Sequence, residues 1–289
     1  MLRSMTGFGR AEGPVNDRKV TVELRSLNSK QLDLQVKVPG VWREKEAELR
    51  QWSSERVVRG KADLYVGLEG GQGEKHTVIN TELVRTYYRE LETLAAGLAP
   101  KAGTDLFAMA MRMPDVLTTA KEEFNPAEWP AVMALVEQAW KAFEEFRVAE
   151  GAKLQEELGQ RTANIRALLA DVDAMDGNRL GRIRDRLVAK LEEWQAKVDQ
   201  QRLEQELVFH IEKLDVSEEK QRLATHCTYF LETMDQEEGQ GRKLAFISQE
   251  MGREINTLGS KSNDAEMQKR VVLMKDELEK IKEQVLNVL

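Results

Sequence analysis

Two carboxylates, Glu250 and Glu254, lie four residues apart within the segment from Gly241 to Asp264. Apolar residues recur every three or four positions in this segment, which predicts a helix with one buried face. The two like charges then share a face, at a cost of a few tenths of a kcal/mol. Arg253 lies beside them. The arrangement predicts a site for a metal ion or a phosphodiester, and a solvated face that Arg253 neutralises is the alternative.

The residues that follow these carboxylates suit an anion. Gly259, Ser260, Lys261 and Ser262 supply backbone donors, two hydroxyls and one ammonium, and we expect them at the N-terminus of the next helix. They lack the spacing of a nucleotide-binding P-loop, so ATPase activity is not expected.

A second group of chemically active residues lies on an earlier predicted helix. Glu219, Arg222 and His226 are spaced i, i+3, i+7 and point away from an apolar stripe. A carboxylate, a guanidinium and an imidazole on one face could bind phosphate and move a proton, although a lone exposed histidine is more often incidental.

The ligand types favour magnesium or manganese over zinc. The chain has no cluster of cysteine and histidine with zinc-ligand spacing, and its carboxylates greatly outnumber its nitrogen ligands. If the two helices face each other, the candidate metal ligands are Glu219, His226, Glu250 and Glu254.

The elements that must position these residues divide the chain into a strand-rich first third and a helical remainder. Alternating apolar residues over 20–24, 32–38 and 62–68 predict strands with one wet face. That pattern is typical of an antiparallel sheet covered on one side, and residues 43–58 are a plausible covering helix. A second helix is expected from a cap at Asn80 to about Leu98.

The remainder predicts long helices with breaks near 176–177, 215–217 and 239–241. We therefore predict an α+β protein with a strand-rich α/β domain at 1–155, long connecting helices at 156–205 and a helical domain at 206–289. The last helix has an expected capping box at Asn263 and Glu266 and a narrow apolar stripe. The stripe could pack within the chain or form a subunit interface.

Composition limits the function classes. The 289 residues carry 50 acidic and 43 basic groups, a net charge of −7, which argues against a protein that coats nucleic acid by charge alone. Basic groups are nevertheless in excess over 1–40 and over 239–262. The single cysteine, Cys227, is expected to pack in a core. We expect a cytoplasmic location, because no signal peptide and no membrane-spanning apolar run is present.

The chain resembles the YicC/YloC family of bacterial endoribonucleases from end to end. The resemblance is carried by SMTGFGRAE at 4–12, VELRSLN at 22–28 and Arg59-Gly60-Lys61, and most specifically by QEM at 249–251 and REINTLGSKS at 253–262. In the helical part, matching positions are Glu206, Lys213, Asp215, Glu218, Glu219, Arg222, Leu223 and His226.

The resemblance implies a metal-dependent endoribonuclease that uses manganese or magnesium. It also implies a substrate of single-stranded or hairpin RNA and a closed homo-oligomer, a hexamer in family members, with a central channel. Other RNA-decay proteins are conceivable partners. Glu219, His226, Glu250 and Glu254 would act in catalysis and hold the metal. RNA would be bound by Arg10, Arg25, Asn28, Lys30, Arg222, Arg253, Asn256, Ser260, Lys261 and Ser262.

Three departures from the family pattern bear on activity. Ser29 replaces a histidine, Ala245 replaces an aspartate and Gly252 stands where asparagine is common. A chain without a required ligand or proton carrier would bind RNA and present it to another nuclease, which is the alternative to cleavage. A helical oligomer that binds no RNA is a third hypothesis.

Overall fold

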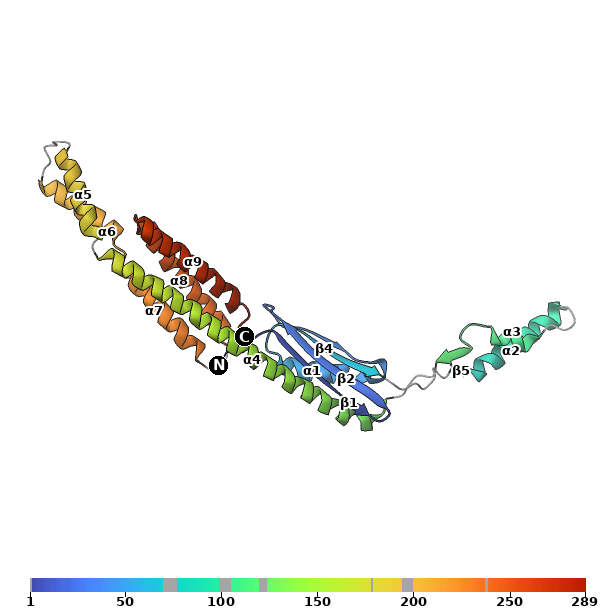
Figure 1. The fold of residues 1–289 in the computed structure, drawn as a ribbon. Coiled ribbons are helices and arrows are strands. Elements are labelled where there is room, and N and C mark those ends of the chain that lie inside the picture. Colours follow the sequence, from blue (N-terminus) through green and yellow to red (C-terminus); the bar gives the residue numbers. More distant parts are fainter. Residues whose placement is uncertain are drawn as a thin grey trace.

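The chain folds into an elongated α+β molecule, which confirms the predicted fold class (Figure 1). The computed structural model describes residues 2–69, 77–98, 105–119, 124–177, 179–193, 200–236 and 239–289. A small lobe, a sheet, a helical bundle and a two-helix arm follow one another along the long axis. Within these ranges, no helix is long and apolar enough to cross a membrane.

The sheet has four strands in the order β1 (Gly7–Val15), β2 (Arg18–Leu27), β4 (Lys61–Glu69) and β3 (Asp33–Lys37). Strands β1, β2 and β4 are antiparallel, as the alternating pattern predicts. Strand β3 pairs in parallel with β4, so the expectation of a wholly antiparallel sheet is wrong. The reason is that α1 (Glu46–Arg56) connects β3 to β4 as a crossover, and crossovers join parallel strands.

One face of this sheet is covered and the other faces solvent. The 3₁₀ turn η1 (Gly40–Lys45) leads into α1, which packs with the long helix α4 (Trp129–Asp176) on the inner face. The β2 residues Val20, Val22 and Leu24 are buried there, in agreement with their alternation with polar residues. A second 3₁₀ turn, η2 (Pro126–Glu128), precedes α4.

Glycines let α4 approach the first strand closely. A Cβ added at Gly9 would lie 2.1 Å from the backbone oxygen of Ala139 and 2.5 Å from the backbone nitrogen of Phe143. A Cβ at Gly7 would lie 2.4 Å from the ring of Phe143. The Gly7-Phe8-Gly9 sequence therefore relieves crowding, as expected for glycine where two backbones meet.

We expect Gly9→Ala to destabilise the protein by about 3 kcal/mol, because the obstructing atoms belong to a helix backbone that cannot swing aside. Thermal unfolding followed by circular dichroism measures the effect. Gly40→Ala is the matched control, since a Cβ at Gly40 would meet nothing within 4 Å. Equal melting temperatures for the two variants would contradict this packing of α4 on β1.

The helical part is a bundle of α4 with α7 (Ser217–Met234), α8 (Gly241–Lys261) and α9 (Ala265–Val285). Helix α4 packs on α7 and α9, and α8 packs on α7 and α9 from the opposite side. The bundle places the start of α8 and the end of α9 beside the sheet (Figure 1). Burial raises the pKa of the Cys227 thiol to about 12, which agrees with the expected packing role of this residue.

Helix α9 packs its apolar stripe inside its own chain. Met267, Val271, Met274, Leu278, Ile281, Val285 and Val288 are all buried in the bundle core. This settles the two alternatives for the stripe in favour of intramolecular packing. The expected cap at Asn263 is wrong by one residue: the side chain of Asp264 accepts hydrogen bonds from the backbone nitrogens of Glu266 and Met267.

A two-helix arm extends from the far end of the bundle. It consists of α5 (Arg179–Glu193) and α6 (Gln200–Leu214). Arg179 anchors its base by pairing with Asp176 at 2.8 Å and donating to the backbone oxygens of Leu214 and Lys261. The division at 155 and 205 stays a prediction, and α4 crosses its first boundary without interruption.

The lobe at the other end contains β5 (Thr77–Ile79), α2 (Thr81–Leu98), α3 (Leu106–Met111) and β6 (Leu117–Thr119). Among the described residues, α2 packs mainly on α3, and β5 packs mainly on β6. The side chain of Asn80 accepts a hydrogen bond from the backbone nitrogen of Leu83, which confirms the predicted cap.

Candidate nucleic-acid interface and catalytic seam

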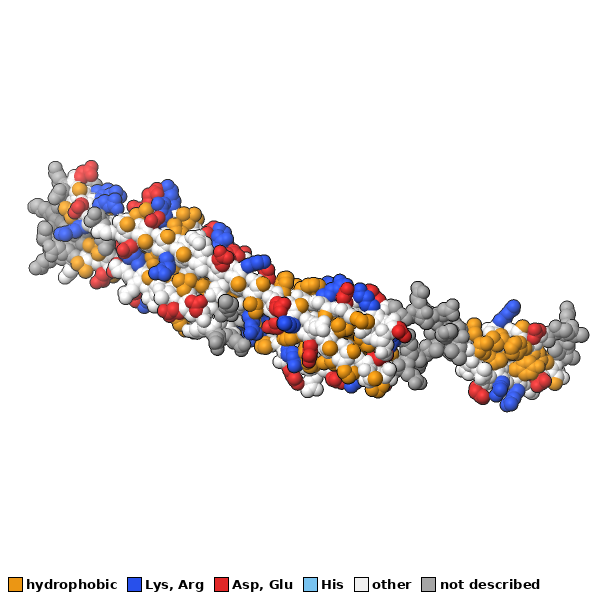
Figure 2. All heavy atoms as spheres, turned by 60° about the horizontal axis from the view of Figure 1, so that its bottom comes forward, with side chains coloured by type: hydrophobic (Ala, Val, Ile, Leu, Met, Phe, Trp, Pro, Cys, Tyr) orange, Lys and Arg blue, Asp and Glu red, His pale blue; other side chains and the backbone are white. Residues whose placement is uncertain are grey.

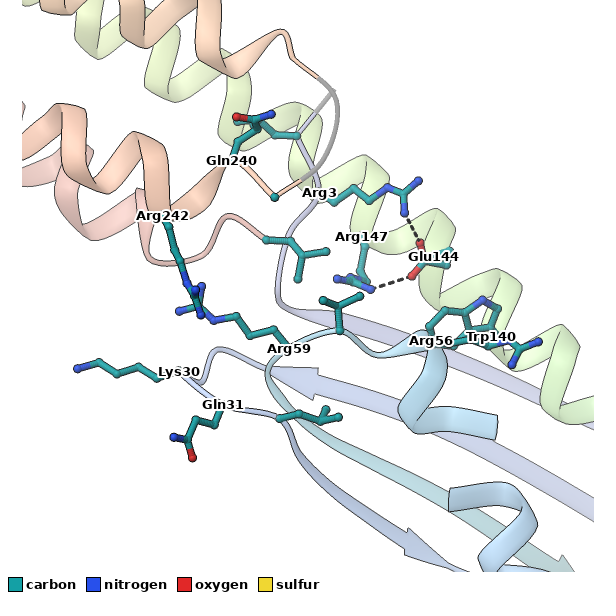
Figure 3. Close-up of a pocket in the computed structure, with 15 residues that line it drawn as sticks. Arg3, Lys30, Gln31, Arg56, Arg59, Trp140, Glu144, Arg147, Gln240 and Arg242 are labelled. Carbon is teal, nitrogen blue, oxygen red and sulfur yellow. Dashed lines mark hydrogen bonds and ion pairs between the residues drawn. The ribbon is translucent and has the colours of Figure 1, made fainter. Parts of the chain in front are cut away.

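A cationic cleft of about 730 Å³ lies where the sheet meets the bundle. Figure 3 shows side chains entering it from the strand loops, from α4 and from the start of α8. Six cations line it: Arg3, Lys30, Arg56, Arg59, Arg147 and Arg242. The single carboxylate side chain in the lining is Glu144, so the described walls are strongly positive.

Half of these cations are already engaged within the protein. Glu144 pairs with Arg3 at 3.3 Å and with Arg147 at 2.8 Å. Burial lowers the pKa of Arg147, although Glu144 acts in the opposite direction. The guanidinium of Arg56 lies 4.1 Å from the ring centre of Trp52 and donates to the Trp52 backbone oxygen.

The remaining three cations, Lys30, Arg59 and Arg242, have no carboxylate partner among the described residues. Arg59 uses only its Nε, which donates to the backbone oxygen of Ser29 at 3.1 Å. The ends of the Arg59 and Arg242 side chains point toward each other, with Lys30 to one side (Figure 3). Cations that converge without a carboxylate suit a bound polyanion, which would relieve their mutual repulsion.

The local backbone explains why Arg59 occupies this position. Gly60 has a φ of 110°, a conformation that L side chains rarely adopt, and a Cβ there would lie 2.9 Å from the backbone oxygen of Leu27. Only glycine fits easily at this turn into β4. The Arg59-Gly60-Lys61 sequence therefore fixes the turn that directs Arg59 into the cleft.

A second feature, the α7–α8 seam, starts beside the cleft and runs along the bundle. We define it by Glu219, Arg222 and His226 of α7 and by Glu250 and Glu254 of α8. Two contacts fix how the helices align: Lys243 Nζ lies 4.7 Å from the ring centre of Tyr229, and Lys261 Nζ lies 2.8 Å from Glu219 Oε1. The helices are therefore antiparallel, and His226 lies level with Glu250 to within about one turn.

The structure thus brings the predicted catalytic residues onto one seam from two helices. Glu250 lies about 12 Å along α8 from Arg242 in the cleft, at 1.5 Å per residue. Nucleic acid held in the cleft could therefore reach the carboxylates and the imidazole without a change of fold.

Burial of the seam carboxylates is unusual. Glu254 is 9% exposed, and within the described residues it has no hydrogen bond or ion pair. Glu219 is 6% exposed, and its Oε2 is buried without a hydrogen-bond partner in the same part of the chain. Glu250 lies 2.8 Å from Arg253 in an ion pair rather than an aligned hydrogen bond. Buried carboxylates with incomplete partners cost stability, which favours a functional role.

The expected four-ligand metal site is not assembled within one chain. No group of three or more histidine, cysteine, aspartate and glutamate side chains could hold a metal ion among the residues that the structure describes. Glu219 is instead bound to Lys261, and Glu250 to Arg253. The two carboxylates of α8, Glu250 and Glu254, are therefore the seam residues near His226 that could supply oxygen ligands to a metal ion.

The expected anion cradle at 259–262 is wrong in its position. These residues form the end of α8 rather than the start of α9. The hydroxyl of Ser262 is buried and donates to the backbone oxygen of Leu258, and the hydroxyl of Ser260 donates to that of Thr257. Gly259 marks close packing rather than a helix start, because a Cβ there would lie 2.9 Å from Val271 of α9.

The other predicted RNA-binding residues divide by location. Lys30 lines the cleft, and Asn28 lies near it on the same loop between β2 and β3. Arg222, Arg253 and Asn256 are exposed on α7 and α8. Arg10 and Arg25 lie elsewhere, on the solvent face of the sheet.

Both of these sheet arginines are already ion-paired. Arg10 pairs with Glu12 at 3.0 Å and with Glu23 at 3.5 Å. Arg25 pairs with Glu23 at 2.7 Å. Their charge is therefore less available to RNA than that of the cleft cations.

The three departures from the family pattern lie away from the seam carboxylates. A Cβ at Gly252 would lie 3.2 Å from Leu278, so this position faces α9. Ala245 lies seven residues earlier, on the same side of α8, and packs on the bundle core. Ser29 lies at the cleft, where its backbone oxygen holds Arg59.

Sequence reasoning missed Arg59 and Arg242 as site residues. The signals were present in the Arg59-Gly60-Lys61 block and in the basic excess over 239–262. The sequence does not show that Arg59 and Arg242, which are 183 positions apart, line the same cleft in the folded chain.

Comparison with known proteins gives two family matches and similar full-length relatives. The N-terminal region of the family described as endoribonuclease YicC-like matches residues 2–156, and its C-terminal region matches residues 172–289. The chain is 29% identical over 293 residues to a probable endoribonuclease YicC of Clostridioides difficile (strain 630). It is 29% identical over 289 residues to a protein of the same name in Haemophilus influenzae. Both alignments cover 100% of each chain.

Proposed function

The chain belongs to the YicC-like endoribonuclease family, and from this we propose that it binds RNA in the cationic cleft and cleaves it at the α7–α8 seam. One observation carries the proposal: Arg59 and Arg242 point toward each other beside Lys30, and none of the three has a carboxylate partner among the described residues (Figure 3). Arg242 lies about 12 Å along α8 from Glu250. A phosphodiester chain supplies the anions that these cations lack.

In this proposal the cleft positions the strand through its phosphates. Arginine forms bidentate, charge-assisted hydrogen bonds with phosphate, which favours Arg59 and Arg242 as the main contacts. Lys30 adds a point charge beside them. Such contacts position RNA without reading its sequence. Arg222, Arg253, Lys261 and Asn256 would follow the strand along the bundle. Ser260 and Ser262 are left out of this set, because their hydroxyls already donate to backbone oxygens of α8.

Cleavage requires two proton transfers. One group takes the proton of the attacking oxygen, and another delivers a proton to the oxygen that leaves phosphorus. A carboxylate and an imidazole that lie level with each other suit these tasks, and we assign them to Glu250 and His226. Glu254 would support Glu250, and Lys261, held by Glu219, would stabilise negative charge at the phosphate.

A divalent cation, Mn²⁺ or Mg²⁺, is a separate part of the proposal. Magnesium commonly binds through one or two carboxylates together with substrate phosphates rather than in a site built only from protein. Glu250 and Glu254 would supply those carboxylates, while RNA supplies the rest. When bound, the cation would stabilise charge at the scissile phosphate.

Self-association through the lobe completes the proposal. Eight large apolar side chains are exposed there: Ile79, Tyr88, Leu94, Leu98, Phe107, Met109, Met113 and Leu117. Figure 2 shows hydrophobic side chains gathered over one face of it. The lobe buries only Val84, Ala110 and Val116 among its described residues, and a unit of this size rarely folds alone. A second copy of the chain is the partner that is always present.

We expect the double variant Leu94→Asp, Phe107→Asp to reduce the mass in solution from a multiple of 33.0 kDa toward that single value. Buried carboxylates would oppose the apolar contact between lobes. Light scattering after size-exclusion chromatography measures the mass. Val272→Asp, at an exposed apolar position of α9, is the control and should leave the mass unchanged. An unchanged mass in the lobe variant would refute this interface.

Incubation with a covalently closed circular RNA tests the proposed function, because only an internal cut linearises a circle. We expect the purified protein to linearise it with Mn²⁺ or Mg²⁺ and to lose this activity in a chelator. Cleavage that persists in the chelator would refute the metal requirement alone. Binding of the circle with no cleavage in either metal would instead favour a scaffold that presents RNA to another nuclease.

A further inference from the structure

Two large aromatic rings are exposed beside the α7–α8 seam. Tyr229 is 41% exposed on α7, and Phe246 is 61% exposed on α8. Neither belongs to the bundle core, where the aromatic residue of this region is Phe230. Exposed aromatic surface without an internal packing role is a recurrent feature of binding sites.

Helix geometry places both rings between the cleft and the proposed catalytic pair. On α8, Lys243, Phe246 and Glu250 are spaced i, i+3, i+7 and share one face. On α7, Tyr229 lies one turn from His226. The ammonium of Lys243 lies 4.7 Å from the ring centre of Tyr229, which brings the two faces side by side.

The neighbouring charges suit a nucleotide. Arg242 of the cleft directly precedes Lys243, and Arg253 continues the same side of α8 beyond Glu250. Aromatic rings flanked by cations are the usual means of holding single-stranded nucleic acid, because every base presents a flat face for stacking. A base can stack on a protein ring only when it is free of its own duplex.

We propose that Tyr229 and Phe246 stack unpaired bases of the RNA that leaves the cleft, and so direct cleavage to single-stranded stretches. This inference rests on the proposed function, since it assigns the substrate selectivity of the same site. Phosphate contacts in the cleft hold any RNA, whereas the two rings select strands whose bases are free.

A contact between subunits is the competing use of these rings. Lys243 over Tyr229 and the exposed Arg242 and Arg253 make their surroundings charged rather than continuously apolar. The larger apolar surface lies on the lobe at the opposite end of the sheet (Figure 2). The surroundings therefore favour RNA as the occupant.

Binding of three RNA probes tests the inference: an unstructured oligonucleotide, the same strand with a central run of abasic sites, and a hairpin of equal length. For the wild-type protein we expect the abasic and hairpin probes to bind about ten-fold more weakly than the unstructured strand. Tyr229→Leu, Phe246→Leu should bind the unstructured strand about ten-fold more weakly and should no longer distinguish it from the abasic strand. Leucine keeps apolar bulk at exposed positions, so folding should be retained.

Tyr65→Leu, at an exposed position of β4 outside the cleft, the seam and the lobe, is the matched control and should behave as wild type. A double variant that still discriminates against abasic sites would overturn the inference, as would a change in oligomeric mass without a change in discrimination. Binding is measured in EDTA, which prevents metal-dependent cleavage. If the protein distinguishes the probes in this assay but does not linearise the circular RNA with Mn²⁺ or Mg²⁺, the nuclease assignment is refuted and the stacking role is supported. Absence of RNA binding by the wild type would refute both.

Discussion

Replacing Arg59 and Arg242 together with glutamine should weaken binding of single-stranded RNA by about a hundred-fold. Each guanidinium supplies a charge-assisted hydrogen bond worth about 1.5 kcal/mol or more to a phosphate. Neither has a carboxylate partner among the described residues, so its loss leaves no buried charge uncompensated. The plot of log affinity against log salt concentration should flatten by about 1.4, because two phosphate contacts are lost.

Fluorescence anisotropy across a salt series measures both quantities. Arg85→Gln, Arg89→Gln removes two charges from the distant helix α2 and is the matched control, for which we expect little change. If the cleft variant binds RNA with wild-type affinity and salt dependence, the RNA does not occupy the cleft.

Replacing Glu250 and Glu254 with glutamine should reduce the cleavage rate by at least about a thousand-fold while leaving RNA affinity unchanged or slightly raised. Glutamine keeps the shape of the side chain but cannot accept a proton, and general acid–base catalysis contributes roughly 10² to 10⁴ in rate. Because Glu254 is buried without a partner among the described residues, the neutral amide should not lower thermal stability.

The matched control for this variant is Glu279→Gln, Glu283→Gln on α9. These two carboxylates have the same four-residue spacing and lie at exposed positions away from the seam. Single-turnover cleavage of the circular RNA should be normal in the control. Similar losses in both variants would attribute the effect to charge on the bundle rather than to the seam.

The sequence predicts those parts of the fold in which periodicity has one solution. Val20, Val22 and Leu24 alternate with polar residues, and they are buried in β2. The apolar stripe of α9 predicts a helix equally clearly. The sequence does not specify what this stripe packs against, because a narrow apolar stripe fits a helix of the same chain and a helix of another subunit equally well.

The sequence does not specify which elements pack closely on one another. Gly259 is typical of a helix boundary, yet here it admits Val271 of α9 against the backbone of α8. The parallel pairing of β3 depends on α1 crossing the sheet, which alternation alone does not specify. The cleft is harder still to predict from the sequence, because its lining residues Arg3, Lys30, Arg59 and Arg242 come together only when the sheet packs on the bundle.

Four of the predicted site residues on α7 and α8 lie along one seam, whereas the predicted residues of the sheet lie apart from it. Glu219, His226, Glu250 and Glu254 have helical spacing, so two packed helices are sufficient to bring them to one seam. The pairing of β1 with β2 places Arg10 and Arg25 on one face of the sheet, but Glu12 and Glu23 lie on the same face and pair with them. Local spacing predicts which side a residue faces, and not which neighbour neutralises it.

Single-turnover cleavage of circular RNA, titrated with increasing protein, separates binding from chemistry in one measurement. We predict that Arg59→Gln, Arg242→Gln will shift the half-saturating protein concentration upward by about a hundred-fold and recover most of the wild-type rate at saturation. Glu250→Gln, Glu254→Gln should keep the wild-type half-saturation and lose the rate at every concentration. Unchanged cleavage by the glutamate variant, or an equal loss of rate at saturation in the arginine variant, would contradict a cleft that binds RNA and a seam that cleaves it.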